Sequence, residues 1–207
     1  NDAGWTCTVD FGDGVNEAGV VVNGTCRAST HTYTDNGAFD VTISVTDKDG
    51  GTGTRTASMV VNNVVPSLTG VANDGPITEG GAATITATAS DVAAAADPLE
   101  YWFDCKSDGF WEVGPQSEDT TDCTYQDNGT FEAQARVGDG DGGWAFGSTT
   151  VIVTNAAPVV ADIETTPASP LEGGGKVYAS ATFTDAGVLD FPRTSLLDAQ
   201  ADDEDLP

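Results

Sequence analysis

One stretch of this chain occurs twice, and that repetition limits the folds open to it. Residues 123–158 repeat the pattern of residues 31–66 without a gap, 92 positions further along. The matched positions include Tyr33 with Tyr125, Phe39 with Phe131, and Pro66 with Pro158. A period of this length is too long for a helical solenoid unit and is the size of a small β-sandwich. The repeat therefore predicts β-sandwiches in tandem.

Each copy indicates two strands and two turns. Residues 39–46 alternate apolar and polar side chains, which is the pattern of a half-buried strand. The Asn-Gly pair at 36–37 favours a hairpin turn because both residues tolerate positive φ. An Asp- and Gly-rich turn follows at 47–51. Since no stretch shows sustained helical periodicity, the predicted class is all-β.

The charge of the chain restricts its partners. Thirty-three acidic and 7 basic residues give a net charge of −26. Phosphate binding needs Lys and Arg, so we expect no nucleic acid partner, and anionic membranes are disfavoured. Divalent cations, or a high-salt medium that screens self-repulsion, are favoured. No apolar run approaches the roughly 18 residues of a membrane span.

Four cysteines fall as two per repeat, Cys7 with Cys26 and Cys105 with Cys123. Three pairings are possible. Pairing within each repeat is favoured because it needs no contact between separate domains. Free or metal-bound thiols are the alternative, although the spacing lacks the paired short motifs of zinc sites. Disulfides would indicate an oxidising, extracytoplasmic compartment.

Three motifs of the first repeat carry a family resemblance. Residues 10–14 read DFGDG, residues 31–33 read HTY, and the turn 47–51 has the form D-x-D-G-G. Together they resemble the PKD (polycystic kidney disease) domain, an Ig-like sandwich of surface and secreted proteins. The resemblance implies an extracellular or cell-surface location. It covers residues 5–63.

The resemblance is weaker over residues 66–155. There Asp104 opens the counterpart of DFGDG, and Cys123 stands where the first repeat has His31. The sandwich arrangement implies that Trp102 lies inside, near the disulfide.

The repeat boundaries divide the chain into unequal parts. We expect residues 1–64 to form a PKD-like sandwich without its first two strands. A complete sandwich is expected over 65–155, and the first two strands of a third over 156–190. Residues 191–207 read as an acidic tail or linker.

The first and third parts are complementary. Residues 158–190 of one chain and 1–63 of another would make one whole sandwich. Two explanations stay open: a window taken from a longer repeat array, or strand complementation between chains that builds head-to-tail filaments. The start at Asn1, without Met or a signal peptide, agrees with a processed chain or a fragment.

Candidate metal ligands lie in the repeated Asp/Gly turn. They are Asp47, Asp49, Asp139 and Asp141, whose alternating carboxylates suit one hard cation such as Ca²⁺. The resemblance supports Ca²⁺ near such loops and domain junctions, where Asn62, Asn63 and Asn155 would add ligands. The competing interpretation is that these Asp residues serve turn chemistry alone.

Nothing in the sequence indicates catalysis. His31 is the only histidine, and no G-x-S-x-G motif accompanies it. The chain has four tryptophans, Trp5, Trp102, Trp111 and Trp144. Their rings could offer a surface for glycans, and the competing interpretation is that they pack in the core or at its edge.

We expect a non-enzymatic, extracellular structural or adhesive repeat protein, which acts as a homo-oligomer or beside neighbouring repeats of a longer chain. The alternative is an accessory module, for substrate binding or spacing, of a secreted polysaccharidase or protease. The flanking sequence would discriminate between them, since further repeats favour the first and a catalytic domain the second.

Overall fold

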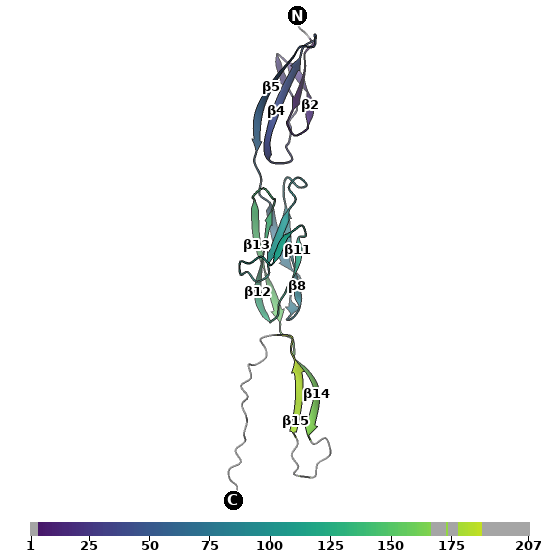
Figure 1. Ribbon diagram of the computed structural model, residues 1–207, viewed down its shortest axis with the longest axis vertical. Coiled ribbons are helices and arrows are strands. Elements are labelled where there is room, and N and C mark those ends of the chain that lie inside the picture. The colour runs from purple at the N-terminus through teal and green to yellow at the C-terminus, as the bar shows by residue number, and fades with distance from the viewer. Residues whose placement is uncertain (1–3, 167–172, 174–177, 188–207) are drawn as a thin grey trace.

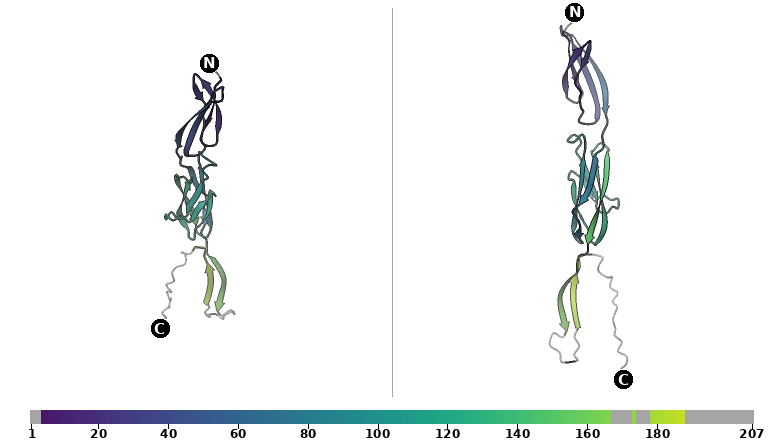
Figure 2. Two further views of the ribbon diagram at one scale, coloured as in Figure 1. Left: turned by 45° about the horizontal axis from the view of Figure 1, so that its top comes forward. Right: turned by 180° about the vertical axis from the view of Figure 1, so that it is seen from behind.

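The computed structural model describes residues 4–166, 173 and 178–187, and every regular element among them is a β-strand. The predicted all-β class is confirmed. The strands form three units that follow one another along the long axis of the molecule (Figure 1). The same succession is visible from behind (Figure 2).

The first unit is a single five-stranded sheet in the order β3-β2-β1-β4-β5. Apolar side chains alternate along β4, as the sequence pattern predicts. No strand of the described chain lies on the inner face of β4 and β5, so Met59 of β5 is 48% exposed. The strands are β1 (Thr6–Asp10), β2 (Asn16–Val22), β3 (Thr25–Arg27), β4 (Gly37–Thr46) and β5 (Thr52–Val61).

The second unit has two facing sheets, in the orders β10-β9-β12-β13-β7 and β11-β8-β6. Phe103, Ile85 and Val151 are fully buried between them. The strands are β6 (Ser67–Asn73), β7 (Ile77–Thr78), β8 (Ala82–Ser90), β9 (Glu100–Asp104), β10 (Val113–Gln116), β11 (Thr120–Thr124), β12 (Gly129–Gly138) and β13 (Trp144–Thr154).

The third unit is a hairpin of β14 (Val159–Thr166) and β15 (Tyr178–Thr184), and both strands are exposed along their whole length. Its register shifts between Val160 and Ile163. The β6–β8 pair of the second unit has the same kind of shift, between Leu68 and Gly70. The predicted tail 191–207 lies wholly outside the described residues.

Two contacts recur in both repeats. The Tyr33 hydroxyl donates to the carbonyl oxygen of Phe11, and the Tyr125 hydroxyl donates to that of Cys105, each at 3.0 Å. A tyrosine that ties a strand end back to upstream backbone is a feature of Ig-like sandwiches. The local resemblance between the repeats therefore extends to side-chain hydrogen bonds.

The structure pairs the cysteines within each repeat, Cys7 with Cys26 and Cys105 with Cys123. The first bridge passes over Gly19 of β2. A Cβ atom at Gly19 would lie 2.5 Å from the Cys7 Sγ, so only glycine leaves room for this disulfide.

Trp102 does not lie in the sandwich core, which corrects the expectation from the sequence. Its neighbours Tyr101 and Phe103 face the core, and strand alternation turns Trp102 to the outer face. There the Arg136 guanidinium lies 4.7 to 4.8 Å from the ring centroids of Trp102, Trp111 and Trp144. Trp5, for which the sequence left glycan contact and packing open, is 47% exposed just before β1.

Candidate cation site at the junction of the first two units

Three carboxylates meet where the first unit adjoins the second. Oxygen atoms of Asp35, Asp97 and Asp141 all lie within 4.8 Å of one another. Asp35 belongs to the Asn-Gly turn before β4. Asp97 comes from the loop between β8 and β9, and Asp141 from the turn between β12 and β13. The group therefore draws on both units.

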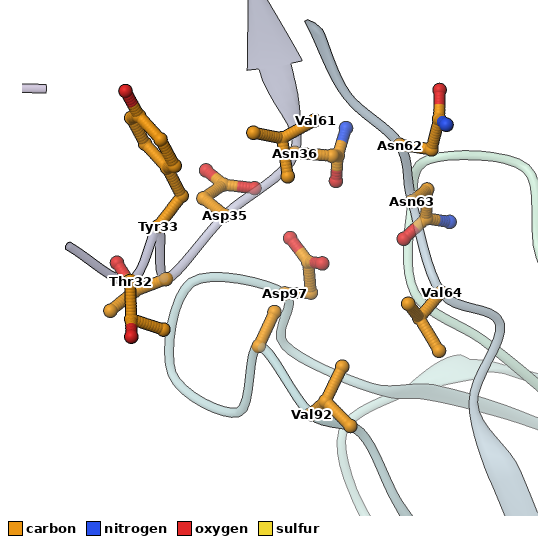
Figure 3. A pocket seen from close by; sticks show the side chains of 12 residues that line it. Thr32, Tyr33, Asp35, Asn36, Val61, Asn62, Asn63, Val64, Val92 and Asp97 are labelled. Carbon is orange, nitrogen blue, oxygen red and sulfur yellow. The ribbon is translucent and has the colours of Figure 1, made fainter. Parts of the chain in front are cut away.

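Asp97 is the central member of this group. Its side chain is only 3% exposed, and its Oδ2 has no hydrogen-bond partner. Its carboxylate points into a cavity of about 280 Å³, toward Asp35 and Asn36 (Figure 3). Burial raises the pKa of Asp97, and the charges of Asp35 and Asp141 raise it further. A buried carboxylate without a donor is costly unless a cation neutralises it.

Asn36 adds a further oxygen on the same cavity wall. Its Oδ1 is buried and has no hydrogen-bond partner. Carboxylate and amide oxygens are the ligands that Ca²⁺ prefers in proteins. Asp35, Asp97 and Asp141, with Asn36 beside them, therefore fit a hard divalent cation. The ion would cancel the mutual repulsion of the three carboxylates.

Asp139 fixes the turn that presents Asp141. Its Oδ1 accepts the backbone N–H groups of Asp141 (3.0 Å) and Gly143 (3.2 Å). Its Oδ2 accepts the side-chain amide of Asn63, 2.8 Å away in the connection between the units. Burial works to raise the pKa of Asp139, but these hydrogen bonds outweigh it and the pKa is lowered. Asp139 thus holds the connection and the turn together.

The corresponding turn of the first unit has no such partner group among the described residues. Asp47 Oδ1 accepts the N–H groups of Asp49 and Gly51, as Asp139 does in the second unit. The Asp49 carboxylate pairs with Lys48 on the surface, at 2.6 Å. Of the four predicted ligands, the structure brings only Asp141 into an acidic group; Asp47 and Asp139 serve the turns, and Asp49 lies on the surface.

A second acidic group differs in its hydrogen bonding. Asp104, Asp108 and Glu112 also lie close together. The Asp104 carboxylate accepts three backbone N–H groups, and Glu112 accepts that of Cys105. These hydrogen bonds already stabilise the charged carboxylates, so this group has less need of a cation than the junction has.

Sequence reasoning missed Asp35 and Asp97. Asp35 directly precedes the Asn-Gly pair, which predicts a turn and no ligand, and Asp97 follows the alanine-rich stretch 93–96, which carries no ligand motif. The position of these residues in the sequence could have indicated them. Asp35 and Asp97 lie in loops at the ends of the two units that meet at the connection between β5 and β6, where ligands from both units can come together.

His31 has a packing role. Its ring stacks on Phe11 with the centroids 4.1 Å apart, and its Nε2 lies 2.6 Å from Asp13 Oδ2. Burial works to raise the pKa of Asp13, but the bonds from His31 and the Val15 N–H outweigh it and the pKa is lowered. No serine or cysteine nucleophile is bonded to His31 in these contacts.

The first repeat is similar to a known protein family. Residues 1–61 match the PKD domain family. The resemblance predicted from DFGDG, HTY and the D-x-D-G-G turn is confirmed for this PKD-matching segment. No curated protein matches the chain.

Solved structures with a similar arrangement include a PKD domain of an M14-like peptidase from a Thermoplasmatales archaeon. It is 21% identical, with a TM-score of 0.33, and the match covers 43% of this chain and 92% of that one. The human desmocollin-1 ectodomain is 13% identical, with a TM-score of 0.33. That match covers 90% of this chain and 40% of the ectodomain.

Among the described residues, the structure has no helix long and apolar enough to cross a membrane.

Proposed function

We propose that this chain is a non-enzymatic structural repeat of an extracellular or cell-surface protein, in which Ca²⁺ holds successive β-units in a fixed orientation. The observation that carries the proposal is the buried, unpartnered Asp97 carboxylate beside Asp35 and Asp141 at the junction. The PKD match and the two disulfides support an extracytoplasmic setting.

The junction suits a mechanical role because its ligands come from different units. An ion bound to Asp35 of the first unit and to Asp97 and Asp141 of the second would oppose bending at the connection. Without the ion, the three carboxylates repel one another and favour separation of the units. Spacing or adhesion at a surface would then depend on the Ca²⁺ concentration.

The test is Ca²⁺ binding to the purified chain, measured by isothermal titration calorimetry together with small-angle X-ray scattering. We expect Ca²⁺ to bind and to narrow the distribution of molecular lengths, and Asp97→Asn to abolish both effects. Asp108→Asn is the matched control, because it removes one carboxylate from the other acidic group. Equal Ca²⁺ responses of the wild type and Asp97→Asn would refute the proposal.

The proposal includes head-to-tail assembly of copies of the chain. The feature that supports it is the uncovered inner face of the first sheet, where Met59 is 48% exposed. Assembly would extend the same linear succession of β-units from one molecule to the next.

An accessory module of a secreted polysaccharidase or protease is the second candidate. The feature that favours it is the group of Trp102, Trp111 and Trp144 on one outer face of the second unit. The Arg136 guanidinium contacts all three rings, which reduces the ring surface left for sugar stacking. Retardation of the chain in polysaccharide-containing gels, lost on Trp144→Ala, would favour this candidate over a spacer.

A further inference from the structure

The inner face of the first sheet has the apolar residues of a sandwich core, but no second sheet covers it among the described residues. Ala135 and Val151 of the second unit are completely buried. Their counterparts 92 positions earlier are Ile43 and Met59, which are 36% and 48% exposed. The same strand pairing thus produces a closed core in one unit and an open apolar face in the other.

In the second unit, the hairpin of β6 and β8 supplies this cover. Leu68 and Val71 of β6 lie against β13, where a Cβ atom at Gly147 would come within 2.9 Å of both side chains. Ile85 and Ala87 of β8 are fully buried against the same sheet. A cover for the first unit therefore needs two strands with apolar residues at these positions.

The β14–β15 hairpin meets that requirement. Its pairing register, with the shift after Val160, matches that of β6 and β8. Five core-facing positions of the β6–β8 hairpin have an apolar counterpart among the described residues of the β14–β15 hairpin. The counterparts are Val160 for Leu68, Ile163 for Val71, Ala179 for Ile85, Ala181 for Ala87 and Phe183 for Ala89. Val160 and Ile163 are 61% and 69% exposed, so this face is accessible.

The first unit also presents backbone for such a strand to join. In the second unit, residues 120–124 form β11 and pair with β8. The counterpart segment, residues 28–32, belongs to no strand of the described sheet. A strand equivalent to β8 would give this segment the antiparallel partner that β11 already has.

One position of the first sheet is larger than its counterpart in the second unit, and it is charged. Arg55 of β5 occupies the position that Gly147 has in the second unit. It is one of the 7 basic residues of the chain, and it would face β14. On β14, Asp162 and Glu164 lie on either side of Ile163 and on the outward face, where Glu164 pairs with Ser180, so they do not meet Arg55. The smaller Val160 in place of Leu68 leaves more room for the arginine.

We propose that the β14–β15 hairpin of one copy of this chain covers the open sheet of a second copy, and that β15 pairs with residues 28–32 of that copy. Within one molecule the hairpin lies at the far end from the first sheet, with the second unit between them (Figures 1 and 2). The partner is therefore another chain, and the contact repeats head to tail. This inference rests on the proposed structural role and specifies the partner and register of assembly.

The first test is the size of the full chain across a concentration series, by light scattering and negative-stain microscopy. We expect linear oligomers for the wild type. Ala181→Asp would place an unpaired carboxylate at a buried position and weaken association roughly 100-fold or more. Ser180→Asp, on the outward face of the same strand, is the control and should leave assembly intact. A monomeric wild type, or oligomers unaffected by Ala181→Asp, would overturn the proposal.

Cross-linking tests the register independently of hairpin stability. Asp122 and Thr84, which hydrogen-bond across β11 and β8 at 2.9 Å, correspond to Thr30 and Tyr178. Mixing Thr30→Cys chains with Tyr178→Cys chains should give a disulfide-linked dimer. Thr182→Cys, on the same outward face but farther along β15, should cross-link at least tenfold less. Equal yields at 178 and 182 would contradict the register and the proposal.

Both assays are run with Ca²⁺ and with a chelator. Calcium binding at the junction is measured separately on the Ala181→Asp chain, which we expect to be monomeric. Loss of assembly with intact Ca²⁺ binding would refute this inference alone. Absence of Ca²⁺ binding with intact cross-linking would refute only the role proposed for the ion.

Discussion

At the scale of single residues, hydrogen bonding separates Asp97 from two other buried carboxylates of the second unit, Asp104 and Asp139. Asp104 and Asp139 are as buried as Asp97, but backbone and amide N–H groups surround their carboxylates. Asp97 Oδ2 has no donor, and its nearest charges are negative. The charged form of Asp97 is therefore disfavoured in the folded state when no cation is bound.

We predict that Asp97→Asn raises the melting temperature of the chelated chain by several degrees and removes the stabilisation by Ca²⁺. Folding raises the pKa of Asp97. Its ionisation therefore lowers the free energy of unfolding as the pH rises above the pKa of Asp in the unfolded chain, about 3.9. The asparagine avoids that loss. Differential scanning calorimetry from pH 4 to 8, with and without Ca²⁺, measures both effects. Asp49→Asn, on the surface, serves as the charge-matched control; an equal shift there would argue against a special role for Asp97.

The sequence predicted the residues that act within one turn better than those that act between units. The D-x-D-G-G pattern correctly placed Asp139 and Asp47 in turns because an Asp side chain bonds to backbone only a few residues ahead. Asp97 has no such local pattern. Its importance comes from burial beside Asp35 of another unit, which no single-residue or short-range rule contains.

At the scale of elements, the repeated turn is the same in both units, but its surroundings differ. Asp139 binds its own turn and also the Asn63 side chain from the connection, whereas the bonds of Asp47 stay within its turn. Asp139 is 3% exposed, so these bonds are protected from water. The turn of the second unit therefore contributes to both the sandwich and the junction.

We predict that Asp139→Ala lowers the free energy of unfolding by about 2 kcal/mol more than Asp47→Ala, since hydrogen bonds to a charged group contribute about 1.5–3 kcal/mol each. Urea denaturation monitored by tryptophan fluorescence gives the difference. Folding lowers the pKa of Asp139. Its contribution to stability is therefore fully present above the pKa of the unfolded state, and it is lost as the pH falls through the pKa of the folded state. The two variants should accordingly converge at acid pH. Equal costs at neutral pH would show that the Asn63 contact contributes nothing.

Strand pairing shows where prediction from the sequence stops. The alternation of residues 39–46 identified β4, and its repeat identified β12. The sandwich arrangement implies that Trp102 lies inside, whereas the structure puts it on the outer face with Arg136. Nor does the sequence show that β11 is a strand paired with β8, whereas its counterpart, residues 28–32, belongs to no strand. That difference depends on whether a β8-like strand is present to pair with the segment.

At the scale of the whole molecule, charge and shape act together. The chain has a net charge of −26, and its described residues form three units in line rather than one compact body. The acidic group at the junction concentrates repulsion where the first two units meet. Two agents can relieve it: a salt that screens all charges, and a cation bound at one place.

We predict that 1 M NaCl raises the melting temperature of both the wild type and Asp97→Asn. At this salt concentration the Debye length is about 3 Å, so repulsion between acidic side chains is weaker throughout the chain. Millimolar Ca²⁺ should act on the wild type alone. Calorimetry at constant pH separates the general effect from the local one. Unchanged melting in both NaCl and Ca²⁺ would mean that the acidic charge does not limit stability.

The placement of the disulfides has a consequence for a molecule under tension. Neither bridge crosses from one unit to the next, and each closes a short segment, with the cysteines 19 and 18 positions apart. If pulling unravelled the second unit, the bond between Cys105 and Cys123 would still withhold about 60 Å of contour length, at roughly 3.5 Å per residue. Oxidised chains would thus have a shorter maximum extension than reduced ones. The redox state of the surroundings would set how far a series of these units can extend under tension before the covalent backbone carries the pulling force.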